Sequence, residues 1–326
     1  MCCNSLIIWC NARFPEDVRQ QLCQGASPHK IVFARKLQAS NLVAGEPDAD
    51  LTAAHIAFGQ PDVPSVLAAP NLRWVHLTTA GYERFDTAEV RTALHKRDAI
   101  LTSSSSVYAE PCAQHCLAMM LALARGLPAA WDNQRLARGW PSGDIRRGSR
   151  LLRKQNVLML GFGAIGRRLA ELLHPFGMYI TAVRRVVTGF ETVRCCLEAD
   201  LLSILPEADH IIDLLPGGEG TRNFMSSDRF ELLKKGACFY NLGRGSTVDH
   251  AALLASLRSG RLAAAYIDVT DPEPLPPDHP LWSAPNCFIT PHTAGGHEGE
   301  PLRIVRHFLT NLHHFTHGEP MRDRII

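Results

Sequence analysis

The chain has 326 residues, of which 46% are hydrophobic and 20% are charged. Single hydrophobic cores rarely grow to this length, so two domains are expected, and the composition excludes a disordered chain. The formal net charge of +2 gives no electrostatic reason to expect a nucleic acid or a membrane surface as a partner.

The cysteines and the N-terminus bear on the location of the protein. No two of the ten cysteines have C-x-x-C spacing, which is typical of reduced thiols rather than of a zinc ribbon or a redox pair. The N-terminus lacks the basic region and apolar run of a signal peptide. The most apolar helix-length stretch, residues 116–124, is far shorter than the ~20 residues that span a bilayer. We therefore expect a cytoplasmic protein.

Short apolar runs alternate with helix-like segments along the whole chain, which predicts parallel sheets with helices on both faces. In the first third, strands are expected at residues 6–10, 31–34, 55–58, 74–77 and 100–102. A long apolar helix follows at residues 109–125, and the polar segment 131–153 is interpreted as a connection. Later strands are expected at 156–160, 179–183, 210–215, 237–242, 263–268 and 287–290. Later helices are expected at 164–173, 251–258 and 299–315.

A glycine-rich turn directly follows the expected strand at 156–160, and its G-x-G-x-x-G pattern leads into a predicted helix. In such a turn Gly161 allows the tight bend, Gly163 lets the backbone approach a pyrophosphate, and Gly166 lets the helix pack closely on the strand. The N–H groups and partial positive charge of the helix N-terminus, at Ala164 and Ile165, favour phosphate groups. The sequence therefore predicts a dinucleotide-binding turn.

Two arginines stand where an NAD-specific site has an acidic residue, which binds the ribose hydroxyls about 20 positions beyond the turn. Here Arg184 and Arg185 follow the strand at 179–183. Charge-assisted hydrogen bonds from guanidinium groups suit a 2′-phosphate. We therefore expect NADP(H) to be preferred, with NAD(H) possible. The alternative is that both arginines are solvated and confer little selectivity.

Three later segments carry polar residues at the carboxyl ends of predicted strands, where α/β sheets place their ligands. They are NLGRGSTVD at 241–249, IDVTDPEPL at 267–275 and ITPHTAGG at 289–296. Together with the glycine turn, these motifs resemble those of the D-isomer-specific 2-hydroxyacid dehydrogenase family. The resemblance covers most of the chain, is clearest over residues 156–295 and is weak before about Leu72.

The resemblance implies three catalytic residues. Arg244 would bind the substrate carboxylate and polarise its carbonyl, since a guanidinium holds a carboxylate through two parallel bonds. His292 would be the general acid in reduction and the base in oxidation, because imidazole titrates near neutral pH. Glu273 would hydrogen-bond His292, fix its tautomer and favour its protonated form. Each residue alone could be an ordinary surface group, and their occurrence together indicates catalysis.

The resemblance also implies further cofactor contacts. Asp268 would lie near the nicotinamide, and Leu242 and Gly243 would line the cofactor with their backbone. The loop that follows the strand at 210–215 would surround the nicotinamide-ribose side through Leu215, Pro216 and Thr221.

A loop in the first third resembles the one whose backbone N–H groups grip the substrate carboxylate. It comprises Thr79, Ala80 and Gly81, and an ordinary turn is the alternative. No metal is required, because Arg244 and His292 supply the charge. The adjacent His313 and His314 are interpreted as part of a solvated helix face rather than a metal site.

The fold implied is α/β, with two doubly wound parallel-sheet domains, in which a Rossmann cofactor domain is inserted into a flavodoxin-like substrate domain. The substrate domain would comprise residues 1–101 and 296–326, and the dinucleotide-binding domain residues 102–295. A homodimer formed through the cofactor domain is expected from the family.

The implied reaction is hydride transfer between NAD(P)H and C2 of a small 2-oxo or 2-hydroxy acid. Reduction of glyoxylate or hydroxypyruvate is expected, and the sequence does not select between them. Two alternatives would use the same fold. One is a dinucleotide-sensing scaffold, whose mark would be a lost triad or long disordered extensions, and the other is a phosphite-type dehydrogenase.

Overall fold

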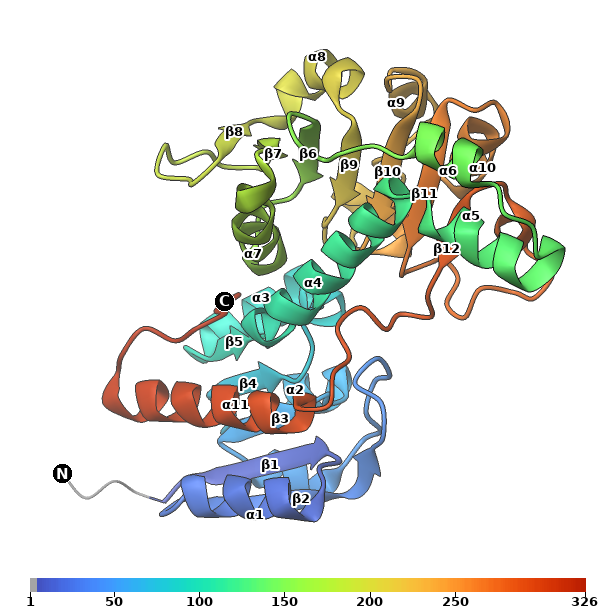
Figure 1. The fold of residues 1–326 in the computed structure, drawn as a ribbon. Helices are drawn as coiled ribbons and strands as arrows, with labels where there is room; N and C mark the ends of the chain where they lie inside the picture. The colour runs from blue at the N-terminus through green and yellow to red at the C-terminus, as the bar shows by residue number, and fades with distance from the viewer. Residues whose placement is uncertain (1–4) are drawn as a thin grey trace. The chain divides into compact units, whose positions relative to one another are not determined.

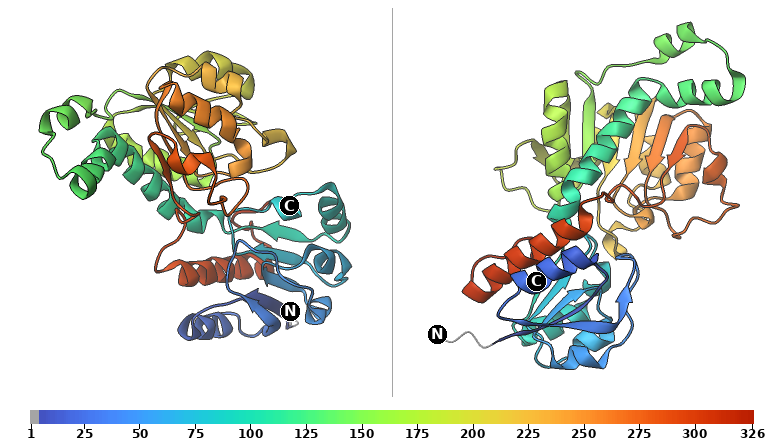
Figure 2. Two further views of the ribbon diagram at one scale, coloured as in Figure 1. Left: turned by 90° about the vertical axis from the view of Figure 1, so that its right-hand side faces the viewer. Right: turned by 60° about the horizontal axis from the view of Figure 1, so that its bottom comes forward.

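The computed structural model describes residues 5–326 and divides the chain into two compact units (Figures 1 and 2). Unit 1 holds the residues up to Tyr108 together with Gly296–Ile326, and unit 2 holds Ala109–Gly295. The division lies at Tyr108, beyond the Leu101 expected from the sequence. The first turn of the long helix stays with unit 1 because the Tyr108 hydroxyl donates to the Thr78 carbonyl at 2.7 Å.

Unit 1 contains a five-stranded parallel sheet in the order β2-β1-β3-β4-β5, which is the flavodoxin-like order. Its strands are β1 (Ile7–Ala12), β2 (Lys30–Gln38), β3 (Ile56–Gly59), β4 (Trp74–Leu77) and β5 (Ile100–Thr102). Its helices are α1 (Glu16–Gly25), α2 (Val63–Ala68), α3 (Ala88–Lys96), the start of α4 (Ser105–Ala124) and α11 (Glu300–His317).

Alternation along β1 sends apolar side chains to both faces of this sheet. Ile8 packs in one core cluster with Leu22 of α1 and Phe308 of α11, two helices that lie side by side (Figure 1). Trp9 packs in another cluster with Val66 of α2. The sheet is therefore covered on both faces, as expected for a doubly wound domain.

The C-terminal residues of the chain cover the outer edge of β5. Arg324 forms an antiparallel bridge with Thr102, and the backbone N–H of Ile325 donates to the Leu101 carbonyl at 2.8 Å. This pairing closes an edge that would otherwise offer unpaired backbone groups.

Unit 2 contains a seven-stranded parallel sheet in the order β12-β11-β10-β9-β6-β7-β8. Its strands are β6 (Asn156–Leu160), β7 (Tyr179–Val183), β8 (Arg194–Cys196), β9 (His210–Asp213), β10 (Ala237–Asn241), β11 (Leu262–Ile267) and β12 (Cys287–Ile289). Besides the rest of α4, its helices are α5 (Leu127–Asp132), α6 (Ser142–Gly148), α7 (Ala164–Leu173), α8 (Leu201–Ile204), α9 (Ser227–Glu231) and α10 (His250–Arg258). Counted from β6, this is the Rossmann strand order with one strand added. The predicted fold class is confirmed.

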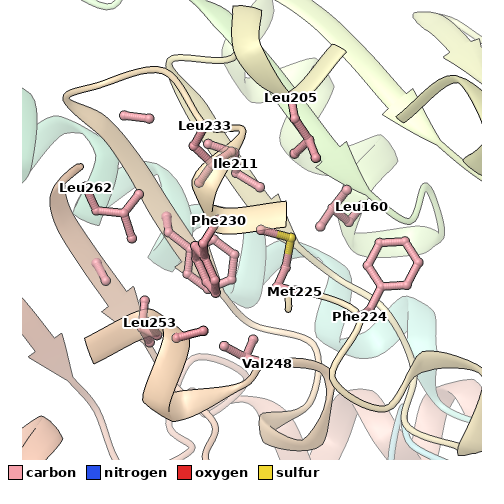
Figure 3. Packing of buried hydrophobic residues seen from close by; sticks show 14 of the residues in the cluster. Leu160, Leu205, Ile211, Phe224, Met225, Phe230, Leu233, Val248, Leu253 and Leu262 are labelled. Atoms are coloured by element: carbon pink, nitrogen blue, oxygen red, sulfur yellow. The ribbon is translucent and has the colours of Figure 1, made fainter. Parts of the chain in front are cut away.

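One hydrophobic cluster anchors the strands that lead into the candidate site (Figure 3). Leu160 of β6 and Ile211 of β9 are fully buried in it. Phe230 of α9 and Leu253 of α10 belong to the same cluster, and Phe230 meets Phe239 of β10 edge-on, with ring centroids 5.3 Å apart. The carboxyl ends of these strands therefore rest on a rigid base.

Two segments of unit 2 differ from the sequence-based expectations. The short strand β8 was not predicted, since Arg-Cys-Cys shows no apolar alternation, and it forms by pairing with Thr181–Val183. The segment 131–153, expected to be only a connection, contains α6 and the π-helical turn Asn133–Ala137. Neither α6 nor this turn has a buried residue. Among the helices of residues 5–326, none is both long and apolar enough to cross a membrane.

Candidate active site

The glycine turn between β6 and α7 has the geometry expected of it. Gly161 has a φ of +94°, and a Cβ atom there would lie 3.1 Å from the Leu214 carbonyl oxygen. A Cβ on Gly166 would lie 3.2 Å from the Gly161 carbonyl oxygen, so both positions favour glycine. A Cβ on Gly163 would meet nothing within 4 Å, so the backbone at the start of α7 is accessible to a ligand. These residues, with Ala164 and Ile165 in the first turn of α7, fit a pyrophosphate group.

Arg184, at the end of β7, is engaged by a carboxylate that the sequence did not reveal. Its Nη1 donates to Glu191 Oε1 at 2.7 Å, while Arg185 is exposed. The side chain of Glu191 is 5% exposed and also accepts bonds from the backbone N–H and the hydroxyl of Thr188 and from the N–H of Gly189. The hydrogen bond from the Thr188 backbone is the largest cause that lowers the pKa of Glu191, to about 2. An anion therefore stands beside the expected phosphate-binding arginine.

The loops after β9 and β10 meet backbone to backbone. A Cβ atom on Gly243 would lie 2.6 Å from the Leu215 carbonyl oxygen, so only glycine allows this approach. The loop that holds Leu215 and Pro216 is closed by the Thr221 hydroxyl, which donates to the Pro216 carbonyl at 2.7 Å. The structure thus brings Leu215 against Gly243, as a shared cofactor surface would require.

His292 and Glu273 form a hydrogen-bonded pair, with 3.0 Å between His292 Nδ1 and Glu273 Oε2. The other carboxylate oxygen of Glu273 accepts from the Thr270 N–H at 3.1 Å. Burial raises the pKa of Glu273, but the bond to His292 and the charges of His292 and Arg244 outweigh it, so the pKa lies below its usual value. Glu273 is therefore held as an anion against one nitrogen of the imidazole.

Arg244 belongs to the same site. Arg244 Nη1 donates to the carbonyl of Gly243, two residues beyond β10, at 2.7 Å, and the charge of Arg244 acts on Glu273. A Cβ on Gly245 would lie 1.9 Å from the carbonyl carbon of Thr270, so the Arg244 loop packs directly on the loop that leads to Glu273. The structure thus brings together all three residues of the expected triad.

Asp268, expected near a nicotinamide, holds the loop that carries His292. The Asp268 side chain is buried and accepts hydrogen bonds from the N–H groups of Thr293 at 2.9 Å and Ala294 at 3.0 Å and from the Thr290 hydroxyl. The His292 backbone N–H donates to the Asp268 carbonyl at 2.8 Å, and its φ of +53° places it in the left-handed region. The position of the imidazole therefore depends on Asp268.

The expected substrate loop lies in unit 1. Thr79 Oγ1 donates to the Gly81 carbonyl at 2.7 Å and accepts from Gln60 Nε2 at 3.1 Å, so the turn around Ala80 is closed internally. Arg84 Nη2 donates to Gln60 Oε1 at 2.6 Å. The sequence reasoning did not name Gln60 or Arg84, because neither lies in a recognised motif.

The expectation of a merely solvated face at His313 and His314 is incomplete. The chain turns at Gly318 and returns Glu319 beside them, so that one ligand atom from each lies within 4.8 Å of the others. The three side chains could hold a metal ion, and they are partly or fully exposed.

A comparison with protein families gives one match, over residues 117–294. The matching family is described as D-isomer specific 2-hydroxyacid dehydrogenase, NAD binding domain. Among curated relatives, a glyoxylate reductase from Aeropyrum pernix is 34% identical over 77% of this chain and 75% of its own. A glyoxylate/hydroxypyruvate reductase B from Citrobacter koseri is also 34% identical, over 68% of each chain.

Solved structures resemble the whole chain. A D-isomer specific 2-hydroxyacid dehydrogenase from Xanthobacter autotrophicus, in complex with NADPH, has a TM-score of 0.82 and 26% identity and covers 99% of this chain and 98% of its own. An NADPH-dependent glyoxylate/hydroxypyruvate reductase from Sinorhizobium meliloti, in complex with NADP and malonate, has a TM-score of 0.74 and 25% identity. The match covers 99% of this chain and 97% of that one.

Proposed function

The chain belongs to the D-isomer-specific 2-hydroxyacid dehydrogenase family, and we propose that it is an NADPH-preferring reductase of glyoxylate or hydroxypyruvate. It is an NAD(P)-dependent oxidoreductase that transfers a hydride between a nicotinamide cofactor and C2 of a small 2-oxo or 2-hydroxy acid. The observation that carries the proposal is the bonded pair of His292 and Glu273 beside Arg244. The named activities of the relatives from Aeropyrum pernix and Citrobacter koseri support the substrate class.

The roles of the triad follow from its contacts. Bound dihydronicotinamide supplies the hydride. Arg244 binds the substrate carboxylate and polarises the 2-oxo group. His292 would give its proton to the carbonyl oxygen of the 2-oxo acid. Because Nδ1 faces Glu273, Nε2 is the nitrogen that serves the substrate, and Glu273 stabilises the charged imidazole before the transfer.

We assign the cofactor to unit 2 and the substrate loop to unit 1. The turn at Gly161–Gly166 would hold the pyrophosphate, and the loops at 215–221 and 242–243 would line the nicotinamide side. Thr79, Ala80 and Gly81 would receive the substrate carboxylate, which fits a turn already closed by the Thr79 hydroxyl. In this proposal unit 1 is the substrate domain and unit 2 the dinucleotide-binding domain.

The preference for NADPH rests on Arg184 and Arg185. One bond from Arg184 to Glu191 leaves donors for a 2′-phosphate, because a guanidinium carries five N–H groups. The exposed Arg185 supplies a second charge. The solved relatives in complex with NADPH or NADP support the same choice.

We further propose a cytoplasmic homodimer formed through unit 2. Leu136 and Trp140, which are 82% and 94% exposed, lie on the segment between α5 and α6. Apolar side chains gathered in this way mark protein contacts. Light scattering should give twice the chain mass, and Trp140→Ser should lower it, while Phe190→Ser, also 94% exposed, serves as the control. A monomeric parent protein would contradict the proposal.

The decisive experiment follows the absorbance of NADPH, and separately NADH, with glyoxylate or hydroxypyruvate. Decay that is faster with NADPH is the expected result, and His313→Asn should preserve it as a control histidine variant. Faster decay with NADH would refute the cofactor preference. Cofactor binding without turnover would indicate a different substrate first and a sensing scaffold second. Reduction of NADP+ or NAD+ by phosphite, with no turnover of either 2-oxo acid, would indicate a phosphite-type dehydrogenase. Either outcome would overturn the proposed activity.

A further inference from the structure

Asp213, the last residue of β9, is a fully buried carboxyl group beneath the loop that carries Arg244. Its Oδ1 accepts a bond from the Leu215 N–H at 2.9 Å, and its Oδ2 lies 2.6 Å from Thr247 Oγ1. Ionised carboxylates are rarely buried without a cation. Here desolvation outweighs both hydrogen bonds and raises the pKa of Asp213 to about 7.

The hydroxyl of Thr247 stands between two acceptor oxygens. Its Oγ1 lies 2.6 Å from Asp213 Oδ2 and also 2.6 Å from the Arg244 carbonyl oxygen. Both separations are typical of O–H···O hydrogen bonds, so each should contain a proton. A hydroxyl has one proton to donate. With an ionised Asp213, one of the two contacts would therefore be a pair of oxygens without a proton between them.

If Asp213 is neutral, both short oxygen–oxygen contacts of Thr247 Oγ1 contain a proton. Its own O–H donates to Thr247 Oγ1, and the Thr247 proton is then available to the Arg244 carbonyl. We propose that Asp213 acts in its protonated form as a positioning residue, which fixes the backbone of Arg244 through Thr247. The inference rests on the proposed function, because Arg244 receives its catalytic role there.

The surroundings of Asp213 agree with a neutral group. The strands on either side pair Leu160 and Asn241 with it, and neither side chain is ionisable. Arg244 is the one ionisable residue between Gly243 and Val248, and its Nη1 donates to the Gly243 carbonyl. Asn241 Nδ2 donates to the Arg244 carbonyl at 2.9 Å and gives this loop a second, uncharged anchor.

The consequence concerns alkaline pH. When Asp213 loses its proton, the Thr247 hydroxyl turns to the carboxylate. The Arg244 carbonyl then keeps its bond from Asn241 and a longer bond, 3.3 Å, from the Thr247 backbone N–H. The Arg244 carbonyl thus loses one of its two side-chain donors, so substrate binding weakens more than cofactor binding does.

Activity measurements test this with variants matched in shape. Asp213→Asn supplies a permanent donor to Thr247, so its kcat/KM should stay within about twofold of the parent at pH 7 and should persist to higher pH. Thr247→Val should lower kcat/KM about tenfold, chiefly through KM for the 2-oxo acid, as expected for one lost hydrogen bond. Thr247→Ser should restore it, and the Kd of NADPH should remain unchanged in all three variants. An Asp213→Asn variant as impaired as Thr247→Val, or with the parent's pH profile, would overturn the inference.

Two further measurements need no turnover and so separate this inference from the proposed function. The first is a ¹³C NMR titration of the parent protein, in which the Asp213 carboxyl signal is identified by its absence from the spectrum of Asp213→Asn. This signal should titrate near pH 7, and a midpoint below pH 5 would refute a neutral Asp213. Because the folded-state pKa is raised, the folded parent binds the extra proton between about pH 4 and 7 and loses stability as pH rises through this window. As pH is raised through this window, the melting temperature of Asp213→Asn should therefore rise relative to that of the parent. A difference in melting temperature that does not change with pH would count against the inference.

Discussion

Two cation–carboxylate pairs lie near opposite edges of the sheet in unit 2. His292 and Glu273 follow β12 and β11, and Arg184 and Glu191 follow β7. Their nitrogen–oxygen distances are similar, at 3.0 and 2.7 Å, but their exposures differ. The side chain of Glu273 is 37% exposed, whereas that of Glu191 is 5% exposed.

The difference lies in what else binds each carboxylate. Glu191 accepts three bonds from Thr188 and Gly189 within its own turn, so its charge is shared among fixed donors and its geometry is locked. Glu273 accepts one backbone bond, from Thr270, and its second oxygen is available to His292. The two pairs therefore differ in their surroundings: one holds the imidazole that we propose as the proton donor, and the other shapes a loop around an arginine.

The largest effect should come from His292→Asn, which removes the proton donor but can keep a hydrogen bond to Glu273. We expect kcat with glyoxylate to fall by about 10²–10⁴-fold, the usual contribution of general acid catalysis, with an unchanged Kd for NADPH. Stopped-flow turnover and fluorescence titration measure the two quantities. Equal losses in both would mean that the histidine is structural.

Arg184→Asp tests the other pair. The variant replaces a phosphate-binding cation by an anion, and a charge-assisted bond contributes about 1.5–3 kcal/mol. The ratio of kcat/KM for NADPH over NADH should therefore fall by at least about tenfold. The solvent-exposed Arg194→Asp is the control for added negative charge near this edge of the sheet. An unchanged ratio for Arg184→Asp would show that Arg184 does not contact the 2′-phosphate.

The strands could be predicted from the sequence, and the residues of the proposed triad could be named from it, because each lies in a local sequence pattern. The bounds of β6 and β7 were predicted correctly, since a glycine turn or a pair of arginines ends each apolar run. Glu191 was missed because its contact with Arg184 depends on how the turn at Thr188 and Gly189 folds back. Asp213 and Thr247 were missed for a similar reason, since Asp213 ends β9, Thr247 lies in the loop after β10, and they meet only when the sheet is assembled.

A smaller effect is expected from Glu273→Gln, which keeps a hydrogen bond to His292 and removes the charge. Without the anion the protonated imidazole is less favoured, so kcat should fall about tenfold and the alkaline loss of activity should begin at a lower pH. A pH profile of kcat between pH 5 and 9 measures both. If the variant instead loses activity at the same alkaline pH as the parent, Glu273 acts through geometry alone.

The smallest effect is expected from Glu191→Gln, which decides whether the Glu191 carboxylate opposes or assists the arginine beside it. The Glu191 carboxylate and a 2′-phosphate held by the same guanidinium would repel each other. Removing the Glu191 charge should therefore raise the NADPH preference by a small factor, well below the effect of Arg184→Asp, and the lost acceptor should lower the melting temperature. Parallel titrations with NADPH and NADH give the ratio. A lower preference for NADPH would mean that the main role of Glu191 is to hold Arg184 in place for the phosphate, because loss of orientation would then outweigh relief of repulsion.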